Sequence, residues 1–371
     1  MSDRSKPRFS LPFTLALFVV YVVFLAGYGI AMLSPHVSPL KTQIPEYFNL
    51  AFGFMLIPLF FFLVYFLLHP RKSGLFLVFH FALIAFTSGY VTTFFPLNVG
   101  EGLKRNRDLR VMTYNVKHFT ARLTAETPPY AVGVIKKYNP DIVCIQETGL
   151  SSSDELLVKA MRTFFTEEAY PVILPNAGKG LTLLSRYPVV SHHPVDYQSY
   201  TNGSESYVID VEGRKLLLIN NHLESYSLTS DEKEKYRDFI SDFSPRRIWD
   251  QFKEVKRRLS PNMNIRVKAA EATRADFEKT AGQVRPDASI ITGDFNDTPM
   301  SYVYSVLKAD GMRDAYQRVG LGPGFTFNER WMPFRIDHVL YSGSLRAVGG
   351  RIPWEKSASD HNPVIIDFEW E

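Results

Sequence analysis

The stretch Ser289–Pro299, SIITGDFNDTP, decides the fold of the larger part of this 371-residue chain. It opens with small and β-branched residues, which favour a short buried strand. Gly293 and Asp294 are turn formers that end such a strand, and Asn296 follows two residues later. The stretch therefore predicts a strand that brings a carboxylate and an amide to one edge of a sheet.

The same arrangement recurs along residues 109–368, where short apolar runs meet polar clusters. Some runs end in the cluster and others begin with it, so the clusters share one edge only if the strands run in both directions. We therefore predict an α+β domain with a mixed or antiparallel sheet, and not a doubly wound parallel sheet. The runs that end in polar residues are Leu109–Tyr114 (Asn115), Asp141–Gln146 (Glu147) and Lys215–Asn220 (Asn221, His222), and those that begin with them are His338–Tyr341 (Arg335, Asp337) and Pro363–Phe368 (Ser359, Asp360, His361).

Helical patterns lie between these runs, at Tyr130–Tyr138, Asp154–Phe164, Tyr302–Lys308 and across Asp231–Gly282. Within the last of these, Arg246–Leu259 is amphipathic with a basic face. Its simplest interpretation is a helix packed on the domain, and contact with a membrane surface or an anionic substrate is the alternative.

Residues 1–100 have a different composition from the rest. They hold six Lys/Arg and two Asp/Glu, which leaves 36 of each sign in residues 101–371, so the formal charge of +4 belongs to the first part. Three uncharged or nearly uncharged stretches, 11–33, 47–68 and 74–95, are long enough to cross a bilayer. We predict three transmembrane helices in residues 1–100, a polar linker at 101–108 and a catalytic domain at 109–371.

The basic residues that flank the three stretches predict an orientation. Arg4, Lys6 and Arg8 precede the first stretch, and Arg71 and Lys72 lie between the second and third. This favours a cytoplasmic N-terminus and an extracytoplasmic catalytic domain, with a bacterial inner membrane as the expected location. Basic residues that follow the third stretch argue the other way, and a cleaved signal peptide is the alternative for the first.

Several single residues have both a functional and a structural interpretation. His80 lies near one end of the third stretch and is expected to be a hydrogen-bonded or interfacial histidine. Cys144, the only cysteine, excludes an intrachain disulfide and is expected to be buried in its strand. His192 and His193 are expected in a loop. The neutral catalytic domain does not favour nucleic-acid binding through overall charge.

The polar clusters favour one reaction class. Carboxylates and amides dominate, accompanied by histidines, and such hard ligands suit Mg²⁺ or Mn²⁺. A bound cation of this kind supports hydrolysis of phosphoesters. The sequence has no GxSxG elbow, no P-loop and no HExxH helix, and a glycosidase would leave the asparagines and histidines unexplained.

Six motifs carry a more specific resemblance. They are YNVKHF (Tyr114–Phe119), IQE (Ile145–Glu147), NNHL (Asn220–Leu223), GDFNDTP (Gly293–Pro299), RIDHVLYS (Arg335–Ser342) and SDHNPV (Ser359–Val364). In this order they resemble the endonuclease/exonuclease/phosphatase superfamily, which includes DNase I-like nucleases, neutral sphingomyelinases and inositol-polyphosphate 5-phosphatases. The resemblance implies a four-layer α/β/β/α sandwich.

The resemblance also implies a metal site. Glu147 would be the principal Mg²⁺ ligand, Asn115 would lie beside it, and Asp360 would serve the metal or its water shell. Lys117 stands where some relatives carry an acid, so a second acidic ligand is not expected there, and a surface lysine is the simplest interpretation.

The catalytic roles follow from the same motifs. The resemblance implies that Asp294 activates the attacking water and that Asn296 holds water or phosphate. His361 would contact the phosphate and be oriented by Asp337, and His222 would contact phosphate or assist the leaving group. His338 replaces an aromatic residue found in many relatives and is expected to fill its packing role.

Together these observations predict a membrane-anchored, Mg²⁺-dependent phosphoester hydrolase. The expected substrate is a phosphodiester or phosphomonoester near the membrane, such as a lipid headgroup. A DNase I-like nuclease and a non-catalytic membrane scaffold are the alternatives. The sequence predicts no oligomeric state.

Overall fold

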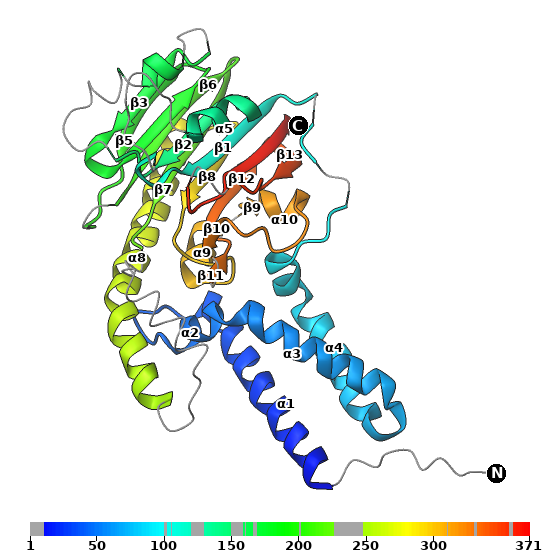
Figure 1. Cartoon of the computed structure of the whole chain (residues 1–371). Helices are drawn as coiled ribbons and strands as arrows, with labels where there is room; N and C mark the ends of the chain where they lie inside the picture. The colour runs from blue at the N-terminus through cyan, green and yellow to red at the C-terminus, as the bar shows by residue number, and fades with distance from the viewer. Residues whose placement is uncertain are drawn as a thin grey trace. The chain divides into compact units, whose positions relative to one another are not determined.

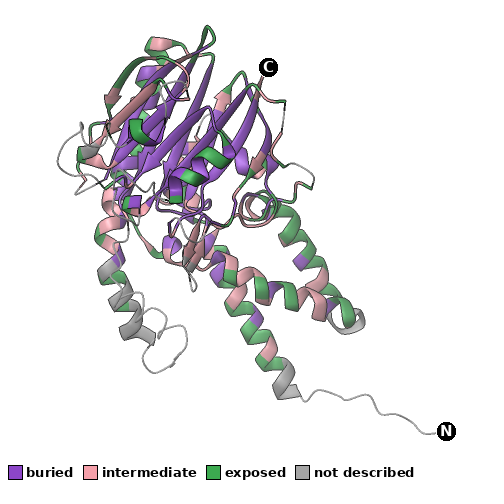
Figure 2. Cartoon of the chain, turned by 45° about the horizontal axis from the view of Figure 1, so that its top comes forward, coloured by how far each residue is buried: buried purple, intermediate pink, exposed green. Residues whose placement is uncertain are grey.

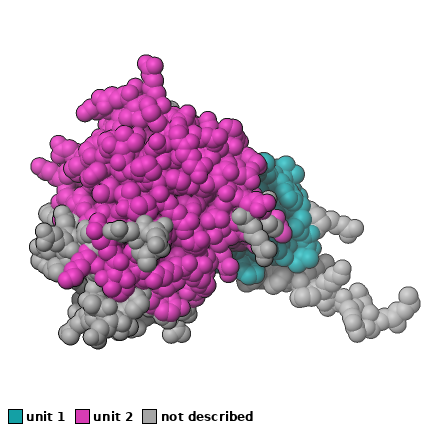
Figure 3. Space-filling view, turned by 90° about the horizontal axis from the view of Figure 1, so that it is seen from above, with its two compact units in different colours: residues 1–91 teal, residues 92–371 magenta. Residues whose placement is uncertain are grey.

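The computed structural model of the chain describes residues 11–99, 102–104, 106–119, 130–149, 159, 161–165, 169–199, 202–225, 248–309, 311–329, 332–355 and 359–371. These fall into two compact units, Met1–Val91 and Thr92–Glu371 (Figure 3). The boundary between them lies inside one helix.

The first unit consists of apolar helices. They are α1 (Leu11–Ala31), the short 3-10 helix η1 (Ser34–His36), α2 (Ile44–Leu50), α3 (Phe52–Leu68) and α4 (Pro70–Phe94), the last of which ends in the second unit. Two of the described helices, at 15–36 and 74–94, are long and apolar enough to cross a membrane. The stretch predicted to cross as one helix at 47–68 is instead bent by 68° between α2 and α3, so it counts as a third crossing only if the bent pair spans together.

Buried polar contacts join these apolar helices. The hydroxyl of Tyr21 lies 3.3 Å from Nδ1 of His80, which agrees with a hydrogen-bonded histidine. Glu46 is 2% exposed and accepts hydrogen bonds from Ser34 (2.5 Å) and Asn49 (3.1 Å). The sequence pattern did not single out Glu46, because the apolar stretch begins at the next residue. The carboxyl group is hydrogen-bonded within its own unit, as a buried polar group requires.

The second unit contains two six-stranded sheets and a small hairpin (Figure 1). One sheet has the order β13 (Leu345–Arg351), β14 (Val364–Trp370), β1 (Leu109–Asn115), β2 (Ile142–Gln146), β4 (Leu181–Ser185) and β3 (Val172–Asn176). The other has the order β5 (Val189–Pro194), β6 (Gly203–Val211), β7 (Arg214–His222), β8 (Ala288–Asp294), β12 (Asp337–Gly343) and β9 (Arg313–Asp314). The hairpin pairs β10 (Phe327–Glu329) with β11 (Met332–Phe334).

The sheets pack face to face, and helices cover their outer faces. Successive strand residues point to opposite faces, so Val111 joins the core between the sheets while Met112 packs under α5 (Tyr130–Tyr138). On the other side, Leu217 and Ile291 pack under α8 (Ile248–Val284) and α9 (Tyr302–Lys308). Figure 2 shows the resulting block of buried strands. The fold is the predicted α/β/β/α sandwich.

Strand direction explains how the polar clusters meet. β1 runs parallel to β2, and β7 runs parallel to β8, so these four strands end at one edge. β14 and β12 run antiparallel to their neighbours and begin at that edge. The register places Asp337 opposite Asp294, and His222 opposite Asp294 on the other side.

Some local expectations are corrected. His192 and His193 lie in β5, not in a loop, and contact Glu205 (2.9 Å) and Asp276 (3.0 Å). All residues of β5 are exposed or half-buried, as in an edge strand, which lacks the apolar signal of a buried one. The helix predicted at 154–164 lies largely outside the described residues, as do Arg246 and Arg247, whereas the rest of the amphipathic stretch is helical as predicted and forms the start of α8.

The segment predicted as a linker at 101–108 is attached to β14 where it is described. The backbone N–H of Lys104 donates to Asp367 (2.6 Å), and that of Asp108 donates to the carbonyl of Phe368 (3.0 Å). Arg110 also donates to Asp367 (2.6 Å). The described part of this segment is therefore packed onto the sandwich.

Candidate active site

Asn115 joins two carboxylates at the edge where β1, β2 and β8 end. Its side-chain amide nitrogen donates to Glu147 (2.9 Å) and to Asp294 (3.0 Å). Its amide oxygen accepts from the backbone N–H of Lys117 (3.1 Å). As placed, Asn115 is a donor to carboxylates, and its oxygen becomes available to a cation only if the amide rotates by half a turn.

Glu147 and Asn296 have an unusual backbone conformation. Glu147 follows β2 with φ 53°, and Asn296 follows β8 with φ 51°. Left-handed φ values are uncommon for residues with a side chain and concentrate at functional sites. The Glu147 side chain keeps about a quarter of its surface exposed, so this carboxylate is accessible.

Asp294 ends β8 in a fully buried position. Burial and the nearby Asp337 carboxylate raise the pKa of Asp294 to about 7, against the opposing effect of His361. The preceding Gly293 has φ +122°, and a Cβ there would lie 2.0 Å from the carbonyl oxygen of Asn221. A glycine is required because β7 passes this close, and that approach sets the position of Asp294.

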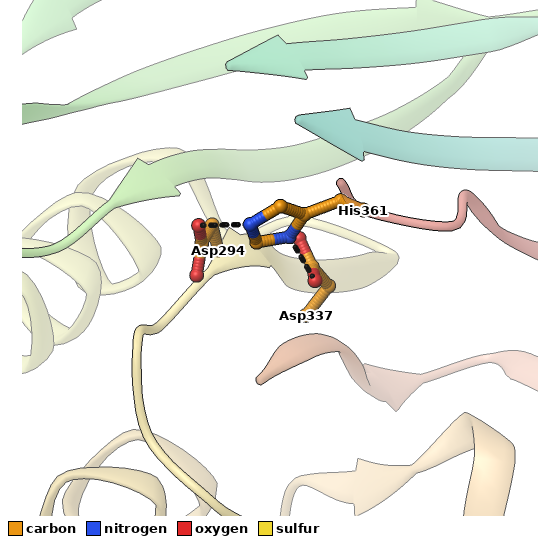
Figure 4. A group of neighbouring side chains, drawn as sticks. All are labelled: Asp294, Asp337 and His361. Atoms are coloured by element: carbon orange, nitrogen blue, oxygen red, sulfur yellow. Dashed lines mark hydrogen bonds and ion pairs between the residues drawn. The ribbon is translucent and has the colours of Figure 1, made fainter. Parts of the chain in front are cut away.

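His361 lies between two carboxylates (Figure 4). Its Nδ1 is 2.8 Å from Asp337 Oδ2, and its Nε2 is 3.8 Å from Asp294 Oδ2. Burial alone would lower the pKa of the imidazole, but Asp337 and Asp294 outweigh burial and raise that pKa to about 10. His361 is therefore a cation at neutral pH, with Nε2 directed toward Asp294.

His222 ends β7 beside the same groups. Its Nε2 lies 3.5 Å from Glu147 Oε1 and 3.9 Å from Asp294 Oδ2. This buried nitrogen makes no hydrogen bond within the described part of the chain. Burial lowers the pKa of His222, against the opposing effect of Glu147. A buried, unsatisfied nitrogen at this position suits contact with a ligand.

Asn296, which is predicted to hold water or phosphate, already makes hydrogen bonds within the chain. Its side-chain nitrogen donates to the carbonyl of Leu223 (2.8 Å), and its backbone N–H donates to Asp294 (2.8 Å). Its own carbonyl accepts from the buried Arg266 of α8, which also approaches Asp297 (3.3 Å). Asn296 thus fixes the turn that follows Asp294.

Asp360 is paired with Lys117. The ammonium Nζ of Lys117 lies 2.6 Å from Asp360 Oδ2, and both side chains are partly exposed. The lysine is therefore engaged at the site, contrary to its simplest interpretation. Of the three predicted metal ligands, Glu147 and Asn115 lie together, and Asp360 already has a cationic partner.

A different set of residues has metal-ligand geometry. Potential ligand atoms of Asp294, Asp337 and His361 lie within 4.8 Å of one another. The cationic His361 disfavours a metal ion at the centre of this group, because like charges repel. The two carboxylates that share Asn115, Glu147 and Asp294, offer oxygen atoms of the kind that Mg²⁺ takes as ligands.

His338 and Cys144 have structural roles. The ring of His338 packs against Phe295 and Tyr304, with centroid distances of 5.0 Å to each, and its Nε2 lies 2.9 Å from the carbonyl of Asp297. Burial and Arg335 lower the pKa of His338 to about 4. Cys144 is fully buried in β2, and burial raises the pKa of its thiol.

Two positioning residues were not predicted from the sequence. The buried hydroxyl of Thr326 accepts from the backbone N–H of Asp337 (3.1 Å). Ser359 donates to the carbonyl of Asn115 (2.8 Å) and accepts from the backbone N–H of His361 (3.1 Å). Ser359 stands in a quoted motif, so a signal existed for it, whereas nothing in the sequence marks Thr326.

The comparison with protein families agrees with this geometry. Residues 112–361, more than half of the chain, match the model of the Endonuclease/Exonuclease/phosphatase family. The chain belongs to this family. Members of the Endonuclease/Exonuclease/phosphatase family are metal-dependent phosphoesterases, and the chain is an enzyme of that class.

Solved structures of the family are similar to the chain at low identity. Truncated TDP2 of Caenorhabditis elegans is 18% identical with a TM-score of 0.47, covering 70% of this chain and 97% of that one. The human Nocturnin catalytic domain is 17% identical with a TM-score of 0.47, covering 72% and 96%. A mannosyl-6-phosphatase of Bacteroides thetaiotaomicron VPI-5482 is 15% identical with a TM-score of 0.46, covering 71% and 100%. No curated protein matches the chain in sequence.

Proposed function

We propose that the chain is a membrane-attached, Mg²⁺-dependent hydrolase of a phosphoester that lies near the bilayer, such as a lipid headgroup. The observation that carries the proposal is the meeting of Glu147, Asp294 and His361 at one sheet edge, two carboxylates with a histidine cation. This combination suits a reaction in which a phosphate and a water must be held together.

The residues present fit a magnesium ion. Oxygens of Glu147 and Asp294 converge on the side-chain amide of Asn115, whose own oxygen would join them if the amide rotated by half a turn. Two carboxylates this close repel each other unless a cation or a proton lies nearby. Glu147, with Asn115 and the water shell, would hold the ion, and Mn²⁺ would fit the same donors. When bound, it supplies charge that stabilises the phosphate in its transition state.

Asp294 would orient and deprotonate the attacking water. Its Oδ1 accepts from the backbone N–H of Asn296, so the turn after β8 holds the carboxylate in one orientation. Its Oδ2 faces Asn115, His222 and His361. A carboxylate fixed in this way acts as a general base on a water brought into the same space.

The two histidines complete a phosphate site. Asp337 holds Nδ1 of His361, and this contact directs the other ring nitrogen, Nε2, toward Asp294. The unsatisfied Nε2 of His222 lies on the other side of Asp294. His361 would neutralise the scissile phosphate, and His222 would contact the phosphate or the leaving group.

The membrane part of the proposal rests on the apolar helices near the N-terminus. Its orientation depends on the bent pair α2–α3. We propose that the N-terminus is cytoplasmic. If the pair crosses the bilayer, the chain makes three crossings, and the catalytic domain lies on the opposite side from the N-terminus. If the pair α2–α3 does not cross, the N-terminus and the catalytic domain lie on the same side of the bilayer. A reporter fused after Glu371 and active only outside the cytoplasm supports the three-crossing arrangement.

The test is one matched assay on the full-length chain in detergent. Phospholipid vesicles, supercoiled plasmid and bis-p-nitrophenyl phosphate are each incubated with Mg²⁺ or with EDTA. Asp294→Asn is compared with the control Asp276→Asn. Asp276 lies in α8 and contacts His193, so the control makes the same substitution at an aspartate that contacts a histidine outside the candidate active site. Mg²⁺-dependent lipid hydrolysis lost only in Asp294→Asn supports the proposal. Preferential cleavage of plasmid favours the nuclease, and absence of both turnover and metal binding favours the scaffold.

A further inference from the structure

A basic hollow lies in the second unit, away from the residues of the candidate active site. Its volume is about 580 Å³. Three cationic side chains and one carboxylate line it, so its lining carries a net positive charge, although Arg346 pairs with the lining Glu369 at 2.5 Å and lies 3.8 Å from Glu371. The lining includes Asn98, Lys104, Arg318, Val348 and the pair Arg346 and Glu369.

One wall of the hollow is the segment that follows α4, and this segment is firmly attached. The side-chain nitrogen of Asn98 donates to the carbonyls of Gln317 (2.9 Å) and Gly320 (3.0 Å). The backbone N–H of Gly322 donates to the carbonyl of Pro96 (2.8 Å). The segment is therefore fixed against α10 (Ala315–Val319) and the turn after it, and α10 carries Arg318 at its C-terminal end.

The end of α4 is held by the same unit. Arg335 donates to the backbone carbonyl of Thr93, in the last turn of α4, and its guanidinium pairs with buried Asp314 at 3.0 Å. α4 ends at Phe94, and Asn98 follows four residues later, at most about 14 Å along the chain. If α4 crosses a bilayer, the hollow lies within reach of the headgroup layer that borders its apolar core.

An apolar rim accompanies the basic lining. Leu97 is 69% exposed and Val99 is 84% exposed, and Leu97 pairs through a β-bridge with Leu321, itself more than half exposed. Large apolar side chains exposed beside basic ones are typical of surfaces that lie in a membrane interface. The rim and the hollow are exposed, and Leu97 and Val99 follow the end of the apolar helix α4 by three and five residues.

We propose that this hollow binds the phosphate of an anionic phospholipid, with the apolar rim in the adjacent acyl region. The inference rests on the proposed membrane attachment. Arg318 and Lys104 attract the phosphate, and Arg346 exchanges part of its contact with Glu369 for it. The site is not catalytic. It holds the catalytic unit against the bilayer, so that a membrane phosphoester stays within reach of the separate active site.

The test measures which lipid the full-length chain retains. The chain in detergent is incubated with an equimolar mixture of phosphatidylglycerol and phosphatidylcholine that carry the same acyl chains. After gel filtration, bound lipids are counted by mass spectrometry. We expect phosphatidylglycerol in excess, and about a fivefold smaller excess for each arginine removed. The variant is Arg318→Gln/Arg346→Gln, and the control Lys279→Gln/Arg351→Gln removes the same charge from exposed positions that do not line the hollow.

Each outcome decides the inference. Loss of the excess in the hollow variant, with retention in the control, supports it. No excess in the wild type, an unchanged excess in the hollow variant, or an equal loss in both variants overturns it. A further outcome is that millimolar inorganic phosphate stabilises the wild type but not the hollow variant, while the wild type shows no lipid preference. This result assigns the hollow to a soluble anion and also overturns the inference. Asp294→Asn is expected to retain lipid like the wild type, so a failure of the proposed catalysis is recognised separately.

Discussion

Lys117 Nζ lies 2.6 Å from Asp360 Oδ2, so the chain places its own cation at a carboxylate predicted to serve a metal. The ammonium reduces the negative charge that Asp360 offers to Mg²⁺. Lys117 also follows Asn115 closely and stands at the same sheet edge. The pair therefore adjusts the electrostatics of the site without any change in its carboxylates.

Lys117→Met is expected to lower the Mg²⁺ concentration needed for half-maximal activity, because Asp360 loses its competing partner. The pair is partly exposed, so the effect should be about two- to fivefold. A Mg²⁺ titration of activity measures it, with Lys279→Met as the control. A higher Mg²⁺ requirement in Lys117→Met would contradict this account of the pair.

The His361–Asp337 pair should behave as one unit. His361→Gln is expected to lower kcat about 100- to 10,000-fold, since it removes the cation directed at the phosphate. Asp337→Asn should cause part of the same loss because it releases the orientation and charge of His361. Steady-state kinetics of both single variants and the double variant test the coupling.

In the double variant, the loss should hardly exceed that of His361→Gln alone, because Asp337 acts through the histidine. Losses that multiply in the double variant would show that Asp337 acts independently of His361. Asp276→Asn controls for removal of an acid that contacts a histidine elsewhere in the unit.

Gly293→Ala should destabilise the fold severely. A Cβ at Gly293 would lie 2.0 Å from a backbone oxygen of the neighbouring strand, at a φ of +122°. We expect a loss of more than about 3 kcal/mol in the free energy of unfolding, measured by thermal or denaturant unfolding in detergent. Gly282→Ala is the matched control, because nothing lies within 4 Å of its Cβ position inside helix α8. Similar stability of the two variants would refute this explanation of the glycine.

His338 should make the fold sensitive to acid. Its pKa is lowered from the usual 6.5 to about 4, so the unfolded chain binds a proton there before the folded chain does. The free energy of unfolding therefore falls as the pH drops through this range, by about 2 kcal/mol between pH 6.5 and pH 5. In His338→Phe this contribution is absent, although the variant loses the bond to the carbonyl of Asp297 and starts out less stable.

Unfolding curves of the wild type and His338→Phe across this pH range measure the difference in slope. Titratable groups that do not interact with His338 titrate alike in both proteins, so they cancel from the comparison. An identical pH dependence in the two proteins would show that His338 is not the buried neutral group described here.

Much of the fold was predictable because strand residues signal burial and direction at the same time. The apolar runs that end at Asn115 and Asp294 and the run that starts after Asp337 required strands of both directions, and the sheets contain them. The continuation of the edge strand β5 through His192 and His193 escaped prediction, because an edge strand meets water along one side and carries few apolar residues that mark it as a strand. The bend between α2 and α3 also left no clear signal in a continuous apolar stretch.

For the site, the sequence identified residue types and strand ends, whereas partners depend on side-chain geometry. Nothing in the spacing shows that Asn115 donates to two carboxylates or that Lys117 reaches Asp360 across more than 200 residues. Thr326 positions Asp337 from a loop without a motif. Such contacts are set by the packing of the two sheets, which a linear pattern does not encode.

The central claim is that Glu147 holds a catalytic cation and Asp294 activates the water. The most direct measurement is a Mg²⁺ titration of phosphodiester hydrolysis by the wild type, Glu147→Gln and Asp294→Asn. We predict that Glu147→Gln raises the half-saturating Mg²⁺ concentration at least about tenfold, while Asp294→Asn loses turnover at every Mg²⁺ concentration. Turnover that is independent of Mg²⁺, or that survives in both variants, would contradict the account.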